Sequence, residues 1–77
     1  MVDLELELLT DEMVSYRYYP EGGEEYGIVS LNRKTGERIL DLPCPNSISM
    51  YAHHAWRLLE KYQSRNRFPE KGWTMWY

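Results

Sequence analysis

The sequence predicts an α+β fold in which one amphipathic helix packs on one face of a small antiparallel β-sheet. Strand-forming residues occur in short runs that are separated by turns containing glycine or proline. Residues 48–62 instead have apolar side chains at three- and four-residue steps, which is typical of a helix that covers a sheet. The length of 77 residues excludes a β/α barrel or a doubly wound dinucleotide-binding fold. We expect the element order β-β-β-α-β, with a possible extra strand at the N-terminus.

Residues 1–12 form either an acidic arm or an edge strand, and residues 13–77 form the α+β domain. Apolar and acidic residues alternate at the start of the arm, which predicts a half-buried strand, although Leu and Glu also favour a helix. The apolar set of this alternation is expected on one face: Val2, Leu4, Leu6 and Leu8.

Residues 13–19, 26–32 and 37–42 are predicted to form a three-stranded meander. The first strand directs Val14, Tyr16 and Tyr18 to one face and Ser15, Arg17 and Tyr19 to the other. Gly27 is interpreted as a possible bulge in the second strand. Gly36 ends the tight connection to the third strand, where it can adopt the left-handed conformation of a short hairpin.

Two prolines around Cys44 end the sheet, and Asn46 or Ser47 is expected to cap the helix that follows. The helix should end near Arg65 or Asn66, before Pro69. Residues 72–77 are a plausible last strand, with Trp73 and Met75 on one face and Trp76 on the other. The apolar stripe of the helix is predicted to contain Ile48, Tyr51, Ala52, Ala55, Leu58, Leu59 and Tyr62.

Charge is distributed unevenly along the chain, whose net charge is −3. Residues 1–25 contain eight acids and one base, whereas residues 26–77 contain eight bases and four acids. Such a split predicts a polar surface field, in which the two halves complement each other or the basic half faces an anion.

The single cysteine, Cys44, excludes an intramolecular disulfide and favours a reducing compartment. The acidic start of the chain is unlike a secretory signal, and no apolar run is long enough for a membrane span. We therefore expect a cytoplasmic protein that does not enter a membrane.

Residues capable of chemistry are present but lack the spacing of a known site. Cys44 with His53 and His54 could make a nucleophile pair or, with Asp41, a zinc site, yet no orienting residue and no zinc-type spacing accompanies them. Adjacent carboxylates point to opposite faces of a strand, and no glycine loop for phosphate is recognisable. We expect neither catalysis nor a metal nor a cofactor.

Interaction with another protein is the function that these residues favour, because aromatic rings outnumber what one helix-covered face can hide. The predicted surface is the sheet face or edge away from the helix. Open sheet edges also favour self-association, so a homodimer is one form of this prediction. The residues expected on this surface are Arg17, Tyr19, Arg38, Trp73, Trp76 and Tyr77.

Binding of nucleic acid is the alternative, since aromatic side chains are interleaved with bases in the second half of the chain. The basic excess is small and no RNA-recognition signature is present. The residues that would contact phosphates lie in the hairpin, on the helix and after it: Arg33, Lys34, Arg57, Lys61, Arg65 and Arg67.

Overall fold

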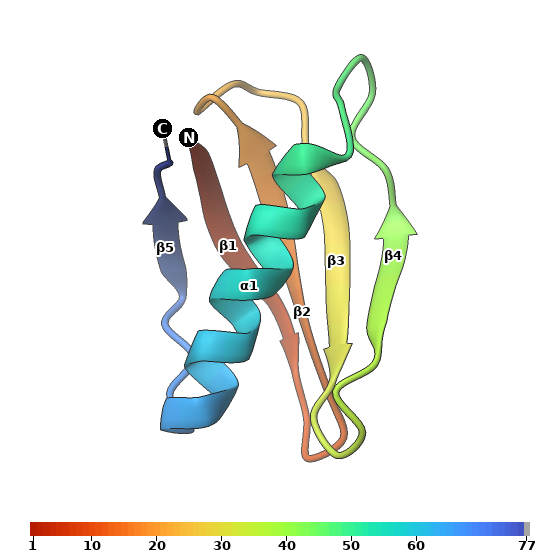
Figure 1. The fold of residues 1–77 in the computed structure, drawn as a ribbon, viewed down its shortest axis with the longest axis vertical. Coiled ribbons are helices and arrows are strands. Elements are labelled where there is room, and N and C mark those ends of the chain that lie inside the picture. Colours follow the sequence, from red (N-terminus) through yellow and green to blue (C-terminus); the bar gives the residue numbers. More distant parts are fainter. Residues whose placement is uncertain (77) are drawn as a thin grey trace.

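The computed structural model describes residues 1–76 and has the predicted α+β architecture, with one helix packed on a five-stranded antiparallel sheet (Figure 1). The strand order is β4-β3-β2-β1-β5. The elements are β1 Val2–Leu9, β2 Met13–Pro20, β3 Gly27–Asn32, β4 Arg38–Leu42, α1 Met50–Arg65 and β5 Lys71–Thr74. The predicted order β-β-β-α-β is confirmed, with the extra N-terminal strand present as β1.

The N-terminal strand β1 is an interior strand and neither a loose arm nor an edge. It pairs with β2 along its whole length and with β5 through Val2 to Glu5. The sheet edges are therefore β4 and β5. Strand β1 thus belongs to the same sheet as the elements of residues 13–76.

The hydrophobic core lies between α1 and the sheet face that β1, β2 and β3 present to it. Tyr16 and Tyr18 share one face, as predicted, and it is this buried face. The Tyr16 hydroxyl donates a hydrogen bond of 2.6 Å to the backbone oxygen of Pro69. Burial of apolar area here is the main source of stability. The other core residues include Val2, Leu4, Val14, Val29, Leu31, Ala52, Ala55, Trp56 and Leu59.

The prediction that Leu8 shares the buried face of β1 is wrong. Leu8 is 49% exposed, because the register of β1 shifts between Leu6 and Leu8, where Glu7 is an extra residue of a β-bulge. The bulge places Leu8 opposite Ser15, on the face away from the helix, since a one-residue shift exchanges the two faces of a strand.

The helix begins later than predicted, with Ser49 at the N-cap, and this displaces Ile48 from the apolar stripe. Ile48 is 62% exposed, whereas Trp56, which the predicted stripe lacks, is buried. The predicted end of the helix is confirmed: Asn66 caps it in the left-handed conformation. Within residues 1–76, no helix has both the length and the apolar character needed to cross a membrane.

Gly27 pairs directly with Tyr18 in regular register, so it is not a bulge. The Tyr18 ring instead lies over the glycine, in the space that a side chain at position 27 would need. Gly36, in contrast, has the predicted left-handed conformation in the turn between β3 and β4, with φ of +80°.

Candidate functional site

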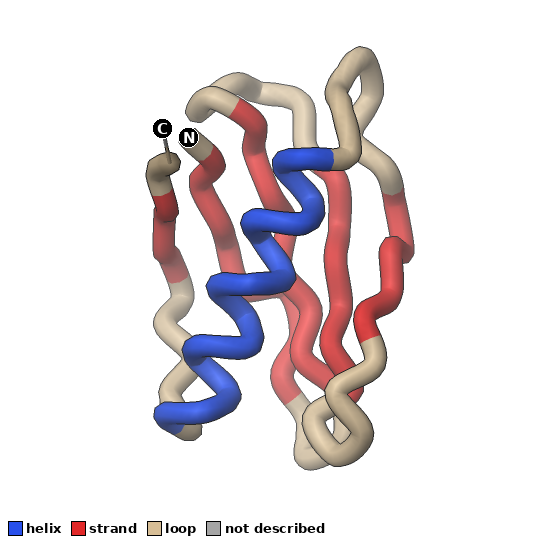
Figure 2. The backbone as a smooth tube through the Cα atoms, viewed as in Figure 1, coloured by secondary structure: helices blue, strands red, loops and turns tan. Residues whose placement is uncertain are grey.

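The sheet face opposite α1 is not covered by any other helix or strand of residues 1–76 (Figure 2). We call it the open face. Along each strand, the side chains that point to it alternate with those that face the helix. Strand pairing arranges them in rows that run across the sheet from β5 through β1 to β2.

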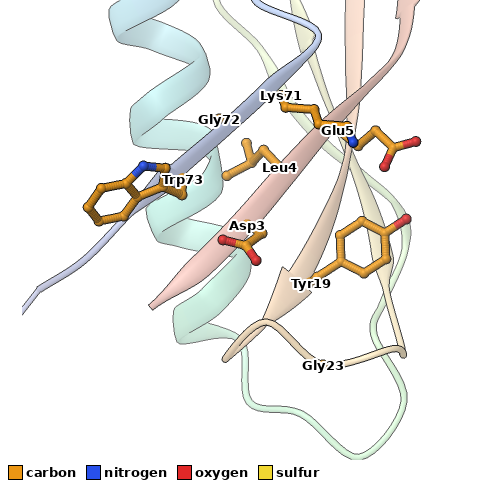
Figure 3. A pocket seen from close by; sticks show the side chains of 8 residues that line it. All are labelled: Asp3, Leu4, Glu5, Tyr19, Gly23, Lys71, Gly72 and Trp73. Carbon is orange, nitrogen blue, oxygen red and sulfur yellow. The ribbon is translucent and has the colours of Figure 1, made fainter.

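The first row of the open face places an acidic residue between two aromatic residues. Asp3 of β1 is paired with Trp73 of β5 on one side and with Tyr19 of β2 on the other. These three residues help to line a shallow depression of about 380 Å³, shown in Figure 3. Trp73 is 60% exposed, so much of its indole is in contact with water.

The second row alternates in charge. Glu5 lies between Lys71 of β5 and Arg17 of β2. Arg17 donates a hydrogen bond of 2.7 Å from Nε to a carboxylate oxygen of Glu7, and its guanidinium lies 4.7 Å from the centre of the Tyr26 ring. The charge of Arg17 is thus largely matched within the molecule.

A chain of hydrogen bonds crosses the open face further along the strands. The hydroxyl groups of Ser15 and Ser30 are 2.6 Å apart, and Ser30 also donates to the carboxylate of Asp41. Both serines are buried, so these bonds satisfy polar groups that would otherwise be costly to desolvate. The chain of bonds holds β2, β3 and β4 in register beneath this face.

The open face is acidic overall. Its four carboxylates outnumber its two bases, and one of those bases, Arg17, is paired with Glu7. The face can therefore hold a cationic group by charge, and its rings add the attraction of an aromatic face for a cation. The charged residues are Asp3, Glu5, Glu7, Asp41, Arg17 and Lys71.

Three of the residues predicted for this surface lie on the open face: Arg17, Tyr19 and Trp73. Arg38 and Trp76 are on the helix side instead, and their placement away from the helix was wrong. Tyr77 lies outside the described residues.

Arg38 points to the helix because it is paired in the sheet with Leu31, which faces the core. Its guanidinium makes two hydrogen bonds to the Glu60 carboxylate, of 2.9 and 2.8 Å. These bonds raise the pKa of Arg38 and lower the pKa of Glu60. The pair is half exposed and contributes little to stability, but it fixes the side chain of Arg38 to α1.

Trp76 lies against the same helix. Its ring stacks on the imidazole of His54, with 3.8 Å between ring centres and 6° between ring planes. Desolvation by burial, followed by the charge of Arg57, lowers the pKa of His54 and so favours the neutral imidazole. Trp73 is thus the exposed tryptophan of the two.

The residues predicted to contact nucleic acid separate into two groups. Arg33 is engaged in the fold, whereas the others project from the surface. The side chain of Arg33 donates three hydrogen bonds. Its Nε donates to Gln63 at 3.0 Å, its Nη1 to the backbone oxygen of Thr10 at 2.6 Å and its Nη2 to Asn66 at 3.0 Å. The guanidinium also lies 4.9 Å from the centre of the Phe68 ring. The exposed residues are Lys34, Arg57, Lys61, Arg65 and Arg67.

An Arg33→Gln variant should therefore lose roughly 1.5–3 kcal/mol of unfolding free energy, since hydrogen bonds to a charged group connect two loops to the end of α1 there. Urea unfolding followed by circular dichroism measures the loss. Lys34→Gln is the matched control: Lys34 is exposed in the adjacent turn, and its replacement should change stability by less than about 0.5 kcal/mol. Equal stabilities of the two variants would contradict the role of Arg33.

Cys44 is buried, and this burial raises the pKa of its thiol, which opposes the formation of a reactive thiolate. Its backbone N–H donates a hydrogen bond of 3.0 Å to the Tyr18 hydroxyl, which anchors the loop before α1 to the core. Among residues 1–76, no three His, Cys, Asp or Glu side chains are grouped so that they could hold a metal ion.

The row formed by Trp73, Asp3 and Tyr19 could not be assembled from sequence alone. The alternation in residues 1–8 indicates that Asp3 and Glu5 share a face, but no local signal places β5 beside β1. Tyr26 was also missed as a partner of Arg17, because it precedes β3 and folds over the open face.

Comparison with models of protein families, with curated proteins and with solved structures finds no match to this chain. The function is therefore inferred from the chemistry of the residues themselves.

Proposed function

We propose that this protein is a small non-catalytic interaction module whose open face binds a segment of another protein that carries a basic side chain. The observation that carries the proposal is the row in which Asp3 is paired with Trp73, whose indole is exposed, on one side and with Tyr19 on the other. Aromatic rings beside a carboxylate attract an ammonium or guanidinium group through both charge and ring quadrupole.

The depression beside this row has a size and setting suited to one side chain. It is shallow and about 380 Å³ in volume, and Glu5 adds a second carboxylate at its edge (Figure 3). Lys71 also lines it and would repel a cation, so the basic group should approach from the side of Asp3 and Trp73. Trp and Tyr are also the residues that most often dominate the binding energy of protein interfaces.

The same charges argue against the open face binding its own copy. In a two-fold symmetric dimer, each patch meets the identical patch of the other subunit, so carboxylates would face carboxylates. A homodimer could still form through the sheet edges, β4 and β5. Light scattering over a range of protein concentrations tests for this edge-to-edge homodimer. A strict monomer at high concentration would exclude it.

Binding of a basic segment is expected to depend on Trp73. The test uses two extended peptides of about eight residues that differ only in a central Lys or Gln, titrated into the ¹⁵N-labelled protein. The Lys peptide should bind more tightly and should shift the amide signals of Asp3 and Tyr19 and the indole signal of Trp73. Trp73→Ala should weaken this binding about tenfold, which corresponds to about 1.4 kcal/mol.

Met75→Ala is the matched control, because Met75 is 51% exposed in the same terminal segment but does not line the depression. It should bind the Lys peptide as the unmodified protein does. Equal binding of the Lys and Gln peptides, equal effects of the two substitutions, or no binding of either peptide would each contradict the proposal.

A further inference from the structure

A basic stripe runs along the outer surface of α1, on the side of the molecule opposite the open face. It consists of Arg57, Lys61 and Arg65, which are spaced four residues apart and therefore project from successive turns of one helix face. All three side chains are exposed. The helical rise places them about 6 Å apart along the axis.

No residue of this stripe makes an ion pair within residues 1–76, although the charge of Arg57 also acts on the carboxylate of Glu60. The only acid in α1 is Glu60, and its two carboxylate oxygens accept hydrogen bonds from Arg38, at the side of the helix that faces β4. The three ion pairs found within residues 1–76 involve Met1 with Glu21, Arg17 with Glu7, and Arg38 with Glu60. A stripe of cations thus faces solvent on a chain whose net charge is negative.

An aromatic platform lies next to the stripe. Trp76 is partly buried on α1, where it stacks on His54 and meets the edge of the Tyr51 ring at 5.6 Å between ring centres. A depression of about 290 Å³ joins the two features, since Arg57, Lys61 and Trp76 all line it. Cations and a fixed ring therefore border the same hollow.

We propose that this hollow and the basic stripe form a binding site for single-stranded nucleic acid, separate from the site on the open face. A base stacks on Trp76 while the phosphates that follow it contact Arg57, Lys61 and Arg65. A strand with unpaired bases fits this arrangement better than a duplex, because only unpaired bases expose the faces that stack on an aromatic ring. Of the contacts predicted on the helix and in the hairpin, this site keeps those on the helix and leaves out Arg33, which is engaged in the fold.

Fluorescence anisotropy tests the proposal with labelled oligonucleotides of about 12 nucleotides, both single-stranded and duplex, at about 50 mM and about 200 mM salt. The single strand should bind more tightly than the duplex, and its affinity should fall steeply with added salt. The double variant Arg57→Gln/Lys61→Gln should bind about tenfold more weakly and should reduce the salt slope by about 1.4, the value for two phosphate contacts.

Two controls separate this site from general charge attraction. The variant Lys34→Gln/Arg67→Gln removes the same amount of charge outside the hollow and should bind the single strand within about twofold of the unmodified protein. Trp76→Phe retains a ring on His54 and should keep most of the affinity, whereas Trp76→Leu should lower it severalfold. Circular dichroism of each variant establishes that it is folded.

Three results would overturn the proposal: no binding at the lower salt concentration, equal losses in the two charge variants, or binding of inorganic polyphosphate as tight as that of the oligonucleotide. The last result would identify a site for polyanions that does not recognise bases. Because the peptide titration uses Trp73 and the oligonucleotide titration uses Trp76, failure of one site leaves the other unaffected.

Discussion

A Gly27→Ala variant is expected to lose about 3 kcal/mol of unfolding free energy, because the added methyl group would overlap the ring of Tyr18. The ring cannot move away freely. It is 3% exposed in the core, and its hydroxyl accepts the hydrogen bond from the backbone N–H of Cys44. Displacement of the ring would therefore disturb the packing under α1 and leave a buried N–H without a partner.

Urea unfolding followed by circular dichroism measures this effect, and a double-mutant cycle identifies its cause. In a Tyr18→Leu background the ring is absent, so Gly27→Ala should cost less than about 1 kcal/mol. An equal cost in both backgrounds would show that the loss comes from the backbone and not from the ring. For a chain of this length the total free energy of unfolding is about 4–12 kcal/mol, so the single variant should already have a visibly lower urea midpoint.

A Trp56→Ala variant is expected to lose roughly 3–5 kcal/mol, the typical cost of removing a large aromatic side chain from a core. Trp56 is 8% exposed and connects α1 to the sheet, since its Nε1 donates a hydrogen bond of 3.0 Å to the backbone oxygen of Ser30. Ser30 is also the residue that hydrogen-bonds to Ser15 and Asp41 on the other face. Removal of the Trp56 side chain should therefore also disturb the hydrogen bonds of Ser30 on the open face.

The other two tryptophans provide the controls for this prediction. Trp73→Ala should change stability by less than about 0.5 kcal/mol because the indole is largely in water, and Trp76→Ala should cost about 1 kcal/mol because the ring is only partly buried. Thermal melts and urea titrations followed by circular dichroism rank the three variants by stability. A Trp73 variant that is less stable than the Trp56 variant would contradict the assignment of core and surface.

The elements could be predicted from sequence because their signals are local. Period-two alternation in residues 13–19 correctly grouped Tyr16 and Tyr18 on one face of β2, and three- and four-residue steps correctly indicated α1. The error at Leu8 arose because a single extra residue changes which face of the strand the following side chains point to. Glu7 adds one residue to β1 and turns Leu8 away from the helix. The amino-acid composition of the strand does not indicate where such a bulge occurs.

The candidate sites were harder to predict because they depend on partners distant in sequence. In the sequence, Arg38 has the features of a surface base. In the fold, the helix brings Glu60, 22 residues later, beside it. Arg33 resembles a phosphate contact until Gln63 and Asn66 surround it. Trp73 and Asp3 become neighbours only when β5 pairs with β1, and strand order is a property of the whole fold.

The pairing of β1 with β5 also has a consequence for the order of folding. Strand β1 meets β2 through a short turn, but it meets β5 only after α1 has crossed the sheet (Figure 1). Closing so long a loop is slow, so the hairpin and the helix should form before β5 docks. Until then β1 has an unpaired edge whose backbone groups can pair with another chain. The four residues of β5 cover this edge from Val2 to Glu5, and we expect the rate at which they dock to determine how long the edge stays unpaired during folding.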